Sequence, residues 1–294
     1  MTLTLKRQAT FLVVPTVLIL ALIVIFPLLF SLYVAVTGYD IRIPEHPFVG
    51  IGNFKNLLKQ SDFYNSLYVT GTLIVVELII ELLLGLILAL LLLQLPGARK
   101  FFQPILLIPM MVMPVVIGYV GRLVFEVRSG PINYFLNLLG FESLQWHASP
   151  TLALITVLIL RLWQWTPFVM AVLLAGLLSL PVEPYDSAQV DGASAWQTFR
   201  YLTVPMLRPV ITLVVIMRTL EILQTFDIIY VLTMGGPGSR TMTVSLYTYL
   251  AGFRYWDVGM ASAAAWFMMI PLSFLITLFV KFMEKGEQQL VETQ

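Results

Sequence analysis

Cysteine is absent from the 294-residue chain, which excludes disulfide bonds and thiolate chemistry. The two histidines, His46 and His147, lie far apart and offer no zinc-binding or histidine-based catalytic spacing. Charged residues make up 11% of the chain, well below the roughly 25% of typical soluble domains. The net charge is +1 and no basic cluster occurs, so the sequence argues against a nucleic-acid partner. A phosphate-loop motif is also missing, so we expect no ATP site of that kind in this chain.

Apolar residues dominate instead: they make up 59% of the chain, and the mean hydropathy is +0.90. About 20 consecutive apolar residues suffice to cross a bilayer as a helix. We therefore predict an all-α polytopic membrane protein with one transmembrane domain over residues 1–294. The six predicted transmembrane helices cover residues 11–36, 68–95, 101–127, 151–178, 210–234 and 259–282.

Lysine and arginine near the ends of the predicted spans favour a cytoplasmic amino terminus. In that orientation the cytoplasmic set is Lys6, Arg7, Arg99, Lys100, Arg200, Arg208, Lys281 and Lys285. The external set is Arg42, Lys55, Lys59, Arg128, Arg240 and Arg254. Both termini and the polar stretch 183–209 then lie on the cytoplasmic side.

The polar stretch 183–209 separates the fourth and fifth predicted spans and is too short to form a domain. Pro184 suits the first turn of a helix, and Gly192 suits its end. From Ala193 we predict a second short helix that places Trp196 and Phe199 on one side. Helices of this length are marginal alone. They indicate a docking element for a partner, with a loop lying on the membrane surface as the alternative.

This stretch also carries a family resemblance. Residues 186–193 read D-S-A-Q-V-D-G-A, and Phe199, Pro205 and Pro209 follow. The pattern resembles the cytoplasmic EAA loop of ATP-binding-cassette importer permeases, E-A-A-x-x-D-G-A followed by an aromatic residue and L-P-x-x-x-P. Asp186 and Ser187 replace the usual Glu and Ala, and Asp keeps the negative charge on a shorter side chain. The resemblance implies that the following residues couple the chain to an ATPase: Asp186, Ser187, Ala188, Asp191, Gly192, Ala193, Trp196 and Phe199.

A second stretch resembles the sugar-importer branch of these permeases. Residues 226–238 read F-D-I-I-Y-V-L-T-M-G-G-P-G, and Tyr247, Tyr249, Phe253 and Gly259 follow. Residues 49–54, V-G-I-G-N-F, resemble the first external loop of the same branch, which serves maltose, trehalose, polyol and glycerol-phosphate uptake systems. The maltose permease carries a large external insertion in its first loop, and this chain does not.

The resemblance implies a multi-subunit machine in the plasma or inner membrane of a bacterium or archaeon. This chain would pair with a second, similar permease subunit in the lipid bilayer, and an external binding protein would deliver a di- or oligosaccharide or a polyol. Two ATPase subunits would bind ATP and Mg²⁺, so the chain itself would need no cofactor and no metal and would not be an enzyme. The docking helix would act as a lever that converts ATPase closure into alternating access.

Several charged residues lie inside predicted spans. A charge at the bilayer centre costs about 2.5–3.5 kcal/mol on insertion scales, so such groups should pair inside the helix bundle. We predict that Glu81 meets Arg161 by depth and that Arg218 pairs with Glu221 at i+3 along one helix. Whether these residues and Glu77 only fix helix register or serve transport stays open at this point.

A substrate pathway is predicted along the fifth span. Glu221, Gln224 and Asp227 recur at i+3 steps, and their polar groups suit sugar hydroxyls. Trp163 can stack on a sugar ring, and Gln164 lies beside it, whereas ordinary interface packing is the favoured interpretation of Trp165. The predicted pathway residues are Glu221, Gln224, Asp227, Trp163 and Gln164.

Two other classes of protein are alternatives to this prediction. An ion-coupled secondary transporter would use the membrane-embedded acids as proton or sodium sites, but it would show an inverted repeat, and none is visible. A membrane-embedded enzyme would need a nucleophile, a metal cluster or paired acids near a histidine. Glu77 and Glu81 form the acid pair, and both histidines lie in predicted loops, so this class is the least favoured.

Overall fold

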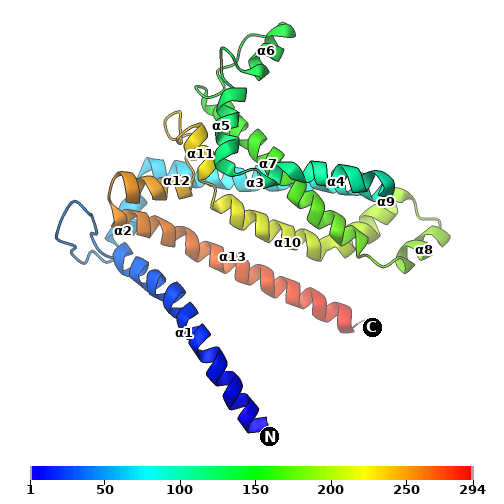
Figure 1. The fold of residues 1–294 in the computed structure, drawn as a ribbon, viewed down its shortest axis with the longest axis horizontal. Helices are drawn as coiled ribbons and strands as arrows, with labels where there is room; N and C mark the ends of the chain where they lie inside the picture. Colours follow the sequence, from blue (N-terminus) through cyan, green and yellow to red (C-terminus); the bar gives the residue numbers. More distant parts are fainter. Residues whose placement is uncertain (1, 293–294) are drawn as a thin grey trace. The chain divides into compact units, whose positions relative to one another are not determined.

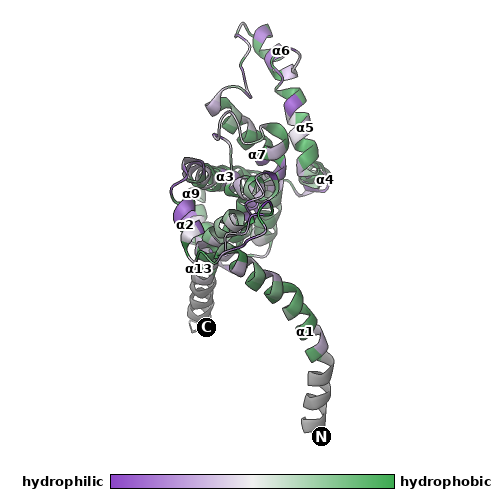
Figure 2. Cartoon of the chain, turned by 90° about the vertical axis from the view of Figure 1, so that its left-hand side faces the viewer, coloured by the Kyte–Doolittle hydropathy of each residue, from purple (hydrophilic) through white to green (hydrophobic). Residues whose placement is uncertain are grey.

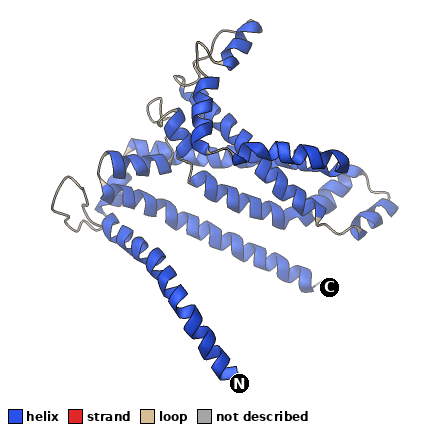
Figure 3. Ribbon diagram, in the orientation of Figure 1, coloured by secondary structure: helices blue, strands red, loops and turns tan. Residues whose placement is uncertain are grey.

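A computed structural model describes residues 2–292, with the side chains of residues 13–274, 276 and 277. The described residues form helices joined by loops, as Figure 3 shows, and contain two isolated β-bridges, between Thr37 and Phe48 and between Asp40 and Asp257. The side chains of Lys6, Arg7, Lys281 and Lys285, on which the predicted orientation partly depends, lie outside the described ones.

The chain divides into two compact units. Unit 1 comprises Met1–Ser61 and Tyr247–Pro271, and unit 2 comprises Asp62–Leu246 and Leu272–Gln294. A single transmembrane domain over residues 1–294 stays a prediction.

Unit 1 contains the amino-terminal helix α1 (Thr2–Ala35) and the short α2 (Gly52–Leu57). It also holds the end of α12 (Val244–Tyr249), the π-helix η2 (Leu250–Arg254) and the start of α13 (Val258–Glu292). The Asn53 side-chain amide ties the loop after α1 to α2 by donating to the carbonyls of Ala35 (2.9 Å) and Thr37 (2.8 Å). A Cβ atom at Gly259 would lie 2.7 Å from the Thr37 carbonyl oxygen, so glycine is needed at this close approach.

Helix α1 exposes most of its apolar surface. Its described apolar part, Val13–Ala35, is long enough to cross a membrane, and it is coloured green along most of its length in Figure 2. Nearly every side chain from residue 13 to residue 33 is exposed, whereas Val34 and Ala35 are buried. The helix therefore has an apolar surface that suits lipid or another apolar chain.

Unit 2 carries the remaining helices (Figure 1). They are α3 (Ser61–Gln94), α4 (Pro96–Met111), α5 (Pro114–Val124), α6 (Pro131–Leu138), α7 (Pro150–Leu178), α8 (Glu183–Val190), α9 (Ala195–Thr198), the π-helix η1 (Phe199–Thr203), α10 (Val204–Leu223) and α11 (Asp227–Leu232).

Its core is built from the faces of α3, α7 and α10. The buried members are Ala89, Leu92, Val169, Met170, Leu173, Leu174, Leu177, Leu207 and Val214. Glycines let these helices approach closely. A Cβ atom at Gly85 would lie 2.8 Å from Val169 Cγ1, and one at Gly176 would lie 2.9 Å from Leu207 Cδ1. These contacts fix α3 against α7 and α7 against α10.

Three described helices are long and apolar enough to cross a membrane, within Val13–Ala35, Ser61–Gln94 and Pro150–Leu178, and a bent pair could supply a fourth. They correspond to the first, second and fourth predicted spans, and each ends within about a residue of the predicted end. The sixth predicted span, 259–282, falls inside α13, whose described apolar part is Val258–Phe274.

The third predicted span, 101–127, is wrong as a single helix. It consists of α4 and α5, which meet at a 91° bend around Val112 and Met113. Pro114 follows the bend, and the residue before a proline is driven out of the α-helical region. Met113 accordingly has an extended backbone (φ −61°, ψ 136°).

The fifth predicted span, 210–234, is also wrong as a single helix. Helix α10 begins earlier, at Val204, and ends at Leu223, and α11 starts after a break at 224–226. Side chains satisfy the carbonyls that the break leaves free. Thr243 Oγ1 donates to the carbonyl of Thr225 (2.8 Å), and Ser245 Oγ donates to that of Leu223 (2.7 Å). Such partners are what a broken helix needs in an apolar environment.

Candidate functional site

Five charged side chains from three helices of unit 2 meet in what we call the ionic cluster: Glu77, Glu81, Arg161, Arg218 and Glu221. The two acids of α3 are four residues apart, and the two charged residues of α10 are three apart, so each pair shares one face of its helix. Four members are almost fully buried, and the Glu221 side chain is 31% exposed.

Arg161 links α7 to both other helices. Its Nε donates to Glu77 Oε1 (2.6 Å) and its Nη2 donates to Glu221 Oε2 (2.9 Å). The predicted pair of Arg161 with Glu81 is therefore wrong by one helical turn. The register of α3 against α7 explains the difference. Gly85 packs on Val169, 84 residues further along the chain, and the same offset of 84 residues pairs Glu77, rather than Glu81, with Arg161.

Arg218 binds the cluster's three acids. Its Nε and Nη2 donate to the two carboxyl oxygens of Glu81, both at 2.7 Å, in a bidentate pair. Its Nη2 also lies 3.4 Å from Glu77 Oε2, and its Nη1 donates to Glu221 Oε2 across the predicted i+3 spacing. The guanidinium carbon lies 4.6 Å from the centre of the Trp165 ring, which suits a cation–π contact.

The ionic cluster holds one more carboxylate than guanidinium. Five of its six carboxyl oxygens accept a hydrogen bond from an arginine, and Glu221 Oε1 is the sixth. Removing one partner of a buried ion pair costs about 3–5 kcal/mol, because a charge is then left without compensation. The cluster therefore holds α3, α7 and α10 in one register.

The residues of the predicted substrate pathway are not gathered on one helical face. Gln224 is exposed at the first residue of the break between α10 and α11, and Asp227 is exposed at the first residue of α11. The predicted i+3 series from Glu221 therefore does not continue along one helix. Trp163 is 52% exposed and lies two residues from Arg161, on another side of α7. Trp165, for which ordinary packing is the interpretation favoured by sequence, is the tryptophan that contacts the ionic cluster.

Gln164 lies at the bend between α4 and α5. It is buried, and its Nε2 donates to the carbonyl of Val112, the residue that follows α4 (3.0 Å). The amide thereby satisfies a carbonyl next to the bend. The prolines of the third predicted span were the sequence signal for a broken helix that needs such a partner.

The polar stretch 183–209 begins with two short helices, α8 and α9, whose facing ends are capped by hydrogen bonds. Helix α8 holds the predicted coupling residues Asp186, Ser187 and Ala188 and ends at a Schellman motif. In this motif the Gly192 N–H donates to the Gln189 carbonyl (3.2 Å) and the Ala193 N–H donates to the Ala188 carbonyl (2.9 Å). Gly192 adopts φ +75°, a conformation that favours glycine. Asp191 lies just before it and is exposed.

The second short helix starts two residues later than predicted. Ser194 caps α9, and Gln197 completes a capping box with it. The S-x-x-Q pattern is the sequence signal that marks this start. The rings of Trp196 and Phe199 lie 5.7 Å apart on one side, and Trp196 is 65% exposed.

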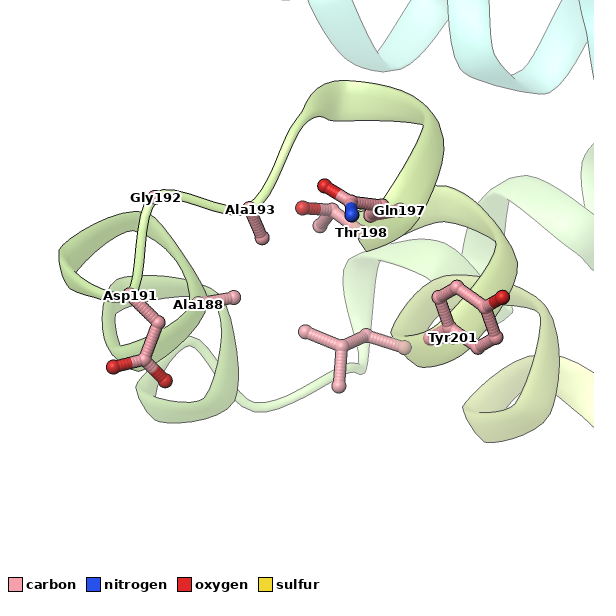
Figure 4. A pocket seen from close by; sticks show the side chains of 8 residues that line it. Ala188, Asp191, Gly192, Ala193, Gln197, Thr198 and Tyr201 are labelled. Carbon is pink, nitrogen blue, oxygen red and sulfur yellow. The ribbon is translucent and has the colours of Figure 1, made fainter.

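A hollow of about 320 Å³ lies between α8 and the helices that follow it. Figure 4 shows Ala188 and Ala193 on one side of it and Thr198 and Tyr201 on the other. The Tyr185 hydroxyl donates to Thr203 Oγ1 (3.1 Å) and ties α8 to η1. Across the described residues, no three His, Cys, Asp or Glu side chains gather as a metal site would require.

Apolar helices that enclose a buried ionic cluster, together with an exposed helical segment between α7 and α10, indicate a helical membrane protein. The family described as binding-protein-dependent transport system inner membrane component matches residues 81–288. The chain belongs to this family of permeases and is therefore a multi-pass inner-membrane transport subunit rather than an enzyme.

Relatives with named substrates extend this comparison. The chain is 32% identical to the trehalose/maltose transport system permease protein MalF of Thermococcus litoralis, over 84% of this chain and 82% of that protein. It is also 32% identical to the sulfoquinovosyl glycerol transport system permease protein SmoG of Agrobacterium fabrum, over 92% of this chain and 88% of that protein. A bacterial alginate ABC transporter, solved with its alginate-pentasaccharide-bound periplasmic protein, has the same fold, with a TM-score of 0.80, 23% identity and 93% coverage of both chains.

Proposed function

We propose that this chain is the permease subunit of an ATP-driven, binding-protein-dependent importer for a di- or oligosaccharide or a polyol. The observation that carries the proposal lies in the segment 183–209, where α8 and α9 form an exposed pair of capped helices between the packed helices α7 and α10. Its D-G-A turn has the geometry of a rigid knob, because the Schellman motif and the capping box satisfy the backbone groups on both sides of Gly192. The substrates named for MalF and SmoG support the sugar class.

The proposed complex has four further members. A second, similar permease subunit would enclose the pathway with this chain, and two cytoplasmic ATPases would bind ATP and Mg²⁺. A binding protein would deliver the sugar from outside, and the alginate transporter supports this member because it was solved in complex with a periplasmic protein that holds an alginate pentasaccharide. In this arrangement the chain crosses the membrane six times, and both termini and the segment 183–209 lie in the cytoplasm.

The coupling surface would combine charge with exposed apolar side chains. Asp186 and Asp191 present carboxylates, and Trp196 and Phe199 form an aromatic pair in the same segment. Ser187, Ala188 and Ala193 complete the predicted coupling set, and their small side chains leave the backbone around Gly192 accessible to a partner. A groove on the ATPase would receive this knob, and closure of the ATPase dimer on ATP would displace it.

The pathway proposal rests on the break between α10 and α11. In transporters, broken helices line the substrate cavity, because free backbone groups and polar side chains are tolerated there. Glu221 Oε1, Gln224 and Asp227 would accept hydrogen bonds from sugar hydroxyls. Trp163 and Gln164 complete the predicted set, with Trp163 offering an exposed ring for stacking.

An ion-coupled mechanism is disfavoured by the way the buried acids are used. Glu77 and Glu81 each accept hydrogen bonds from arginine side chains. A carboxylate held by a guanidinium is poorly placed to exchange a proton or a sodium ion. Uptake should therefore depend on ATP and survive collapse of the ion gradients.

The experiment is reconstitution of the chain with its partner subunits in proteoliposomes. Uptake of trehalose, maltose and a polyol would be measured with and without ATP and with and without the binding protein. We expect uptake that requires both ATP and the binding protein for at least one of these solutes. Uptake by this chain alone, or uptake driven by a proton or sodium gradient without ATP, would contradict the proposal.

A further inference from the structure

The two helices attached to the segment 183–209 meet again at the ionic cluster. Helix α7 ends shortly before the segment, and the last six residues of the segment, 204–209, are the start of α10. Near the segment they pack through Gly176 against Leu207 and Val210. At 1.5 Å per residue, Arg161 lies roughly 25 Å along α7 from its end, and Arg218 lies roughly 20 Å along α10 from its start. The α7–α10 pair is therefore joined at two levels, one apolar and one ionic.

Glu221 makes the direct ionic contact between these two helices. Its Oε2 accepts from Arg161 Nη2 on α7 (2.9 Å) and from Arg218 Nη1 on its own helix. The other bonds of the two arginines go to α3: Arg161 holds Glu77, and Arg218 holds Glu81 in a bidentate pair. Without Glu221, the ionic connection between α7 and α10 would run only through α3.

We propose that Glu221 is a positioning residue that ties α7 to α10 through Arg161, so that a displacement of the segment 183–209 moves both helices as one body. This proposal rests on the proposed function, since it assumes that the segment is pushed by an ATPase. Glu221 suits the role because it bridges both guanidinium groups at once. Its partial exposure leaves Oε1 free while Oε2 holds the bridge.

The ionic link from Arg161 on α7 to Glu221 on α10, which we call the ionic joint, predicts how substitutions at Glu221 change sugar uptake per ATP. Glu221→Gln keeps the size of the side chain but removes the charge that holds both arginines. In the reconstituted complex we expect the amount of sugar taken up per ATP hydrolysed, measured at saturating sugar, to fall at least about tenfold. Glu221→Asp keeps the charge on a shorter side chain and should retain more of this ratio. Glu142→Gln, the same change at an exposed loop position, should leave the ratio unchanged.

A role limited to contact with the sugar would give a different pattern. If Glu221 acts only on the sugar, Glu221→Gln raises KM while the uptake per ATP at saturating sugar stays the same, and that result overturns the joint. If Glu221→Gln fails to assemble with its partners, the Glu221→Asp variant decides, because the proposed link requires uptake per ATP at saturating sugar to fall below that of the wild type.

A distance measurement tests the joint independently of transport. The chain has no cysteine, so Ile159→Cys on α7 and Met217→Cys on α10, both partly exposed, would carry the spin labels without competing sites. In the assembled complex we expect Glu221→Gln to broaden the distribution of distances between the two labels. A distribution of label distances that is the same in Glu221→Gln and the wild type would overturn the proposed ionic joint. If the wild-type complex shows no ATP-dependent uptake, the proposed function fails, and the label distances still decide whether Glu221 joins the helices.

Discussion

At the scale of single residues, Arg218 shows why a guanidinium rather than an ammonium stands at this position. Its planar group binds Glu81 at two points and reaches Glu77 and Glu221 with its terminal nitrogens. Its face lies over Trp165. A lysine carries the same charge on a flexible stem and matches neither the bidentate geometry nor the stacking.

We therefore expect Arg218→Lys to destabilise the protein by about 1.5–3 kcal/mol, the loss of at least one hydrogen bond to a charged group. The measurement is the free energy of unfolding, or the melting temperature of the complex in detergent. Arg208→Lys, on the exposed side of the same helix, is the matched control and should change stability by less than about 0.5 kcal/mol. Equal stability of the two variants would contradict the role of the buried guanidinium.

Residue spacing predicted part of the ionic cluster. The i+3 pair of Arg218 and Glu221 lies within one helix, where the 3.6-residue period decides which side chains meet. The predicted partner of Arg161 is wrong because depth counted along separate spans carries an error of about a turn. The Gly85 contact, which sets the register of α3 and α7, depends on packing that no single helix encodes.

At the scale of elements, helix ends were more predictable than helix breaks. Pro184 and Gly192 mark the start and end of α8 because each has a local conformational reason. The breaks at 112–113 and 224–226 were missed, because each lies inside a stretch long enough to cross a bilayer as one helix. Their carbonyls find partners on distant residues such as Gln164 and Thr243, and hydropathy does not report such partners.

Gly192 allows a test of the turn between α8 and α9. A Cβ atom there meets no atom within 4 Å, so the effect of a substitution comes from the positive φ rather than from a clash. We expect Gly192→Val to destabilise the turn by roughly 1–2 kcal/mol and to reduce sugar uptake per ATP in the assembled complex. Gly192→Asn should retain most of this coupling, because asparagine tolerates the left-handed region. Equal coupling in the two variants would remove the turn from the proposed lever.

At the scale of the whole molecule, composition indicated a helical membrane protein, and the described helices agree with that class. The orientation in the membrane depends instead on a modest excess of basic residues on one side. Arg200 is exposed in the segment 183–209, and Arg240 is exposed in the loop after α11. In the proposed topology these two arginines face opposite sides of the membrane.

Trypsin would test that topology. Added to spheroplasts, the protease should cleave after Arg240 and spare Arg200. Added to inverted membrane vesicles, it should cleave after Arg200 and spare Arg240. The fragments would be identified by mass spectrometry. Cleavage at Arg200 from outside intact spheroplasts would place the segment 183–209 on the wrong side for an ATPase and refute the proposed docking.

Helix α1 also bears on how the protein is made. It precedes the other described helices in the sequence, and from residue 13 to residue 33 its side chains are almost all exposed. A helix whose own backbone bonds are satisfied and whose surface is apolar is stable in lipid by itself. This segment can therefore enter the bilayer before the helices that follow it have been synthesised, and it can anchor the growing polypeptide while the charge-bearing helices α3, α7 and α10 are still being translated.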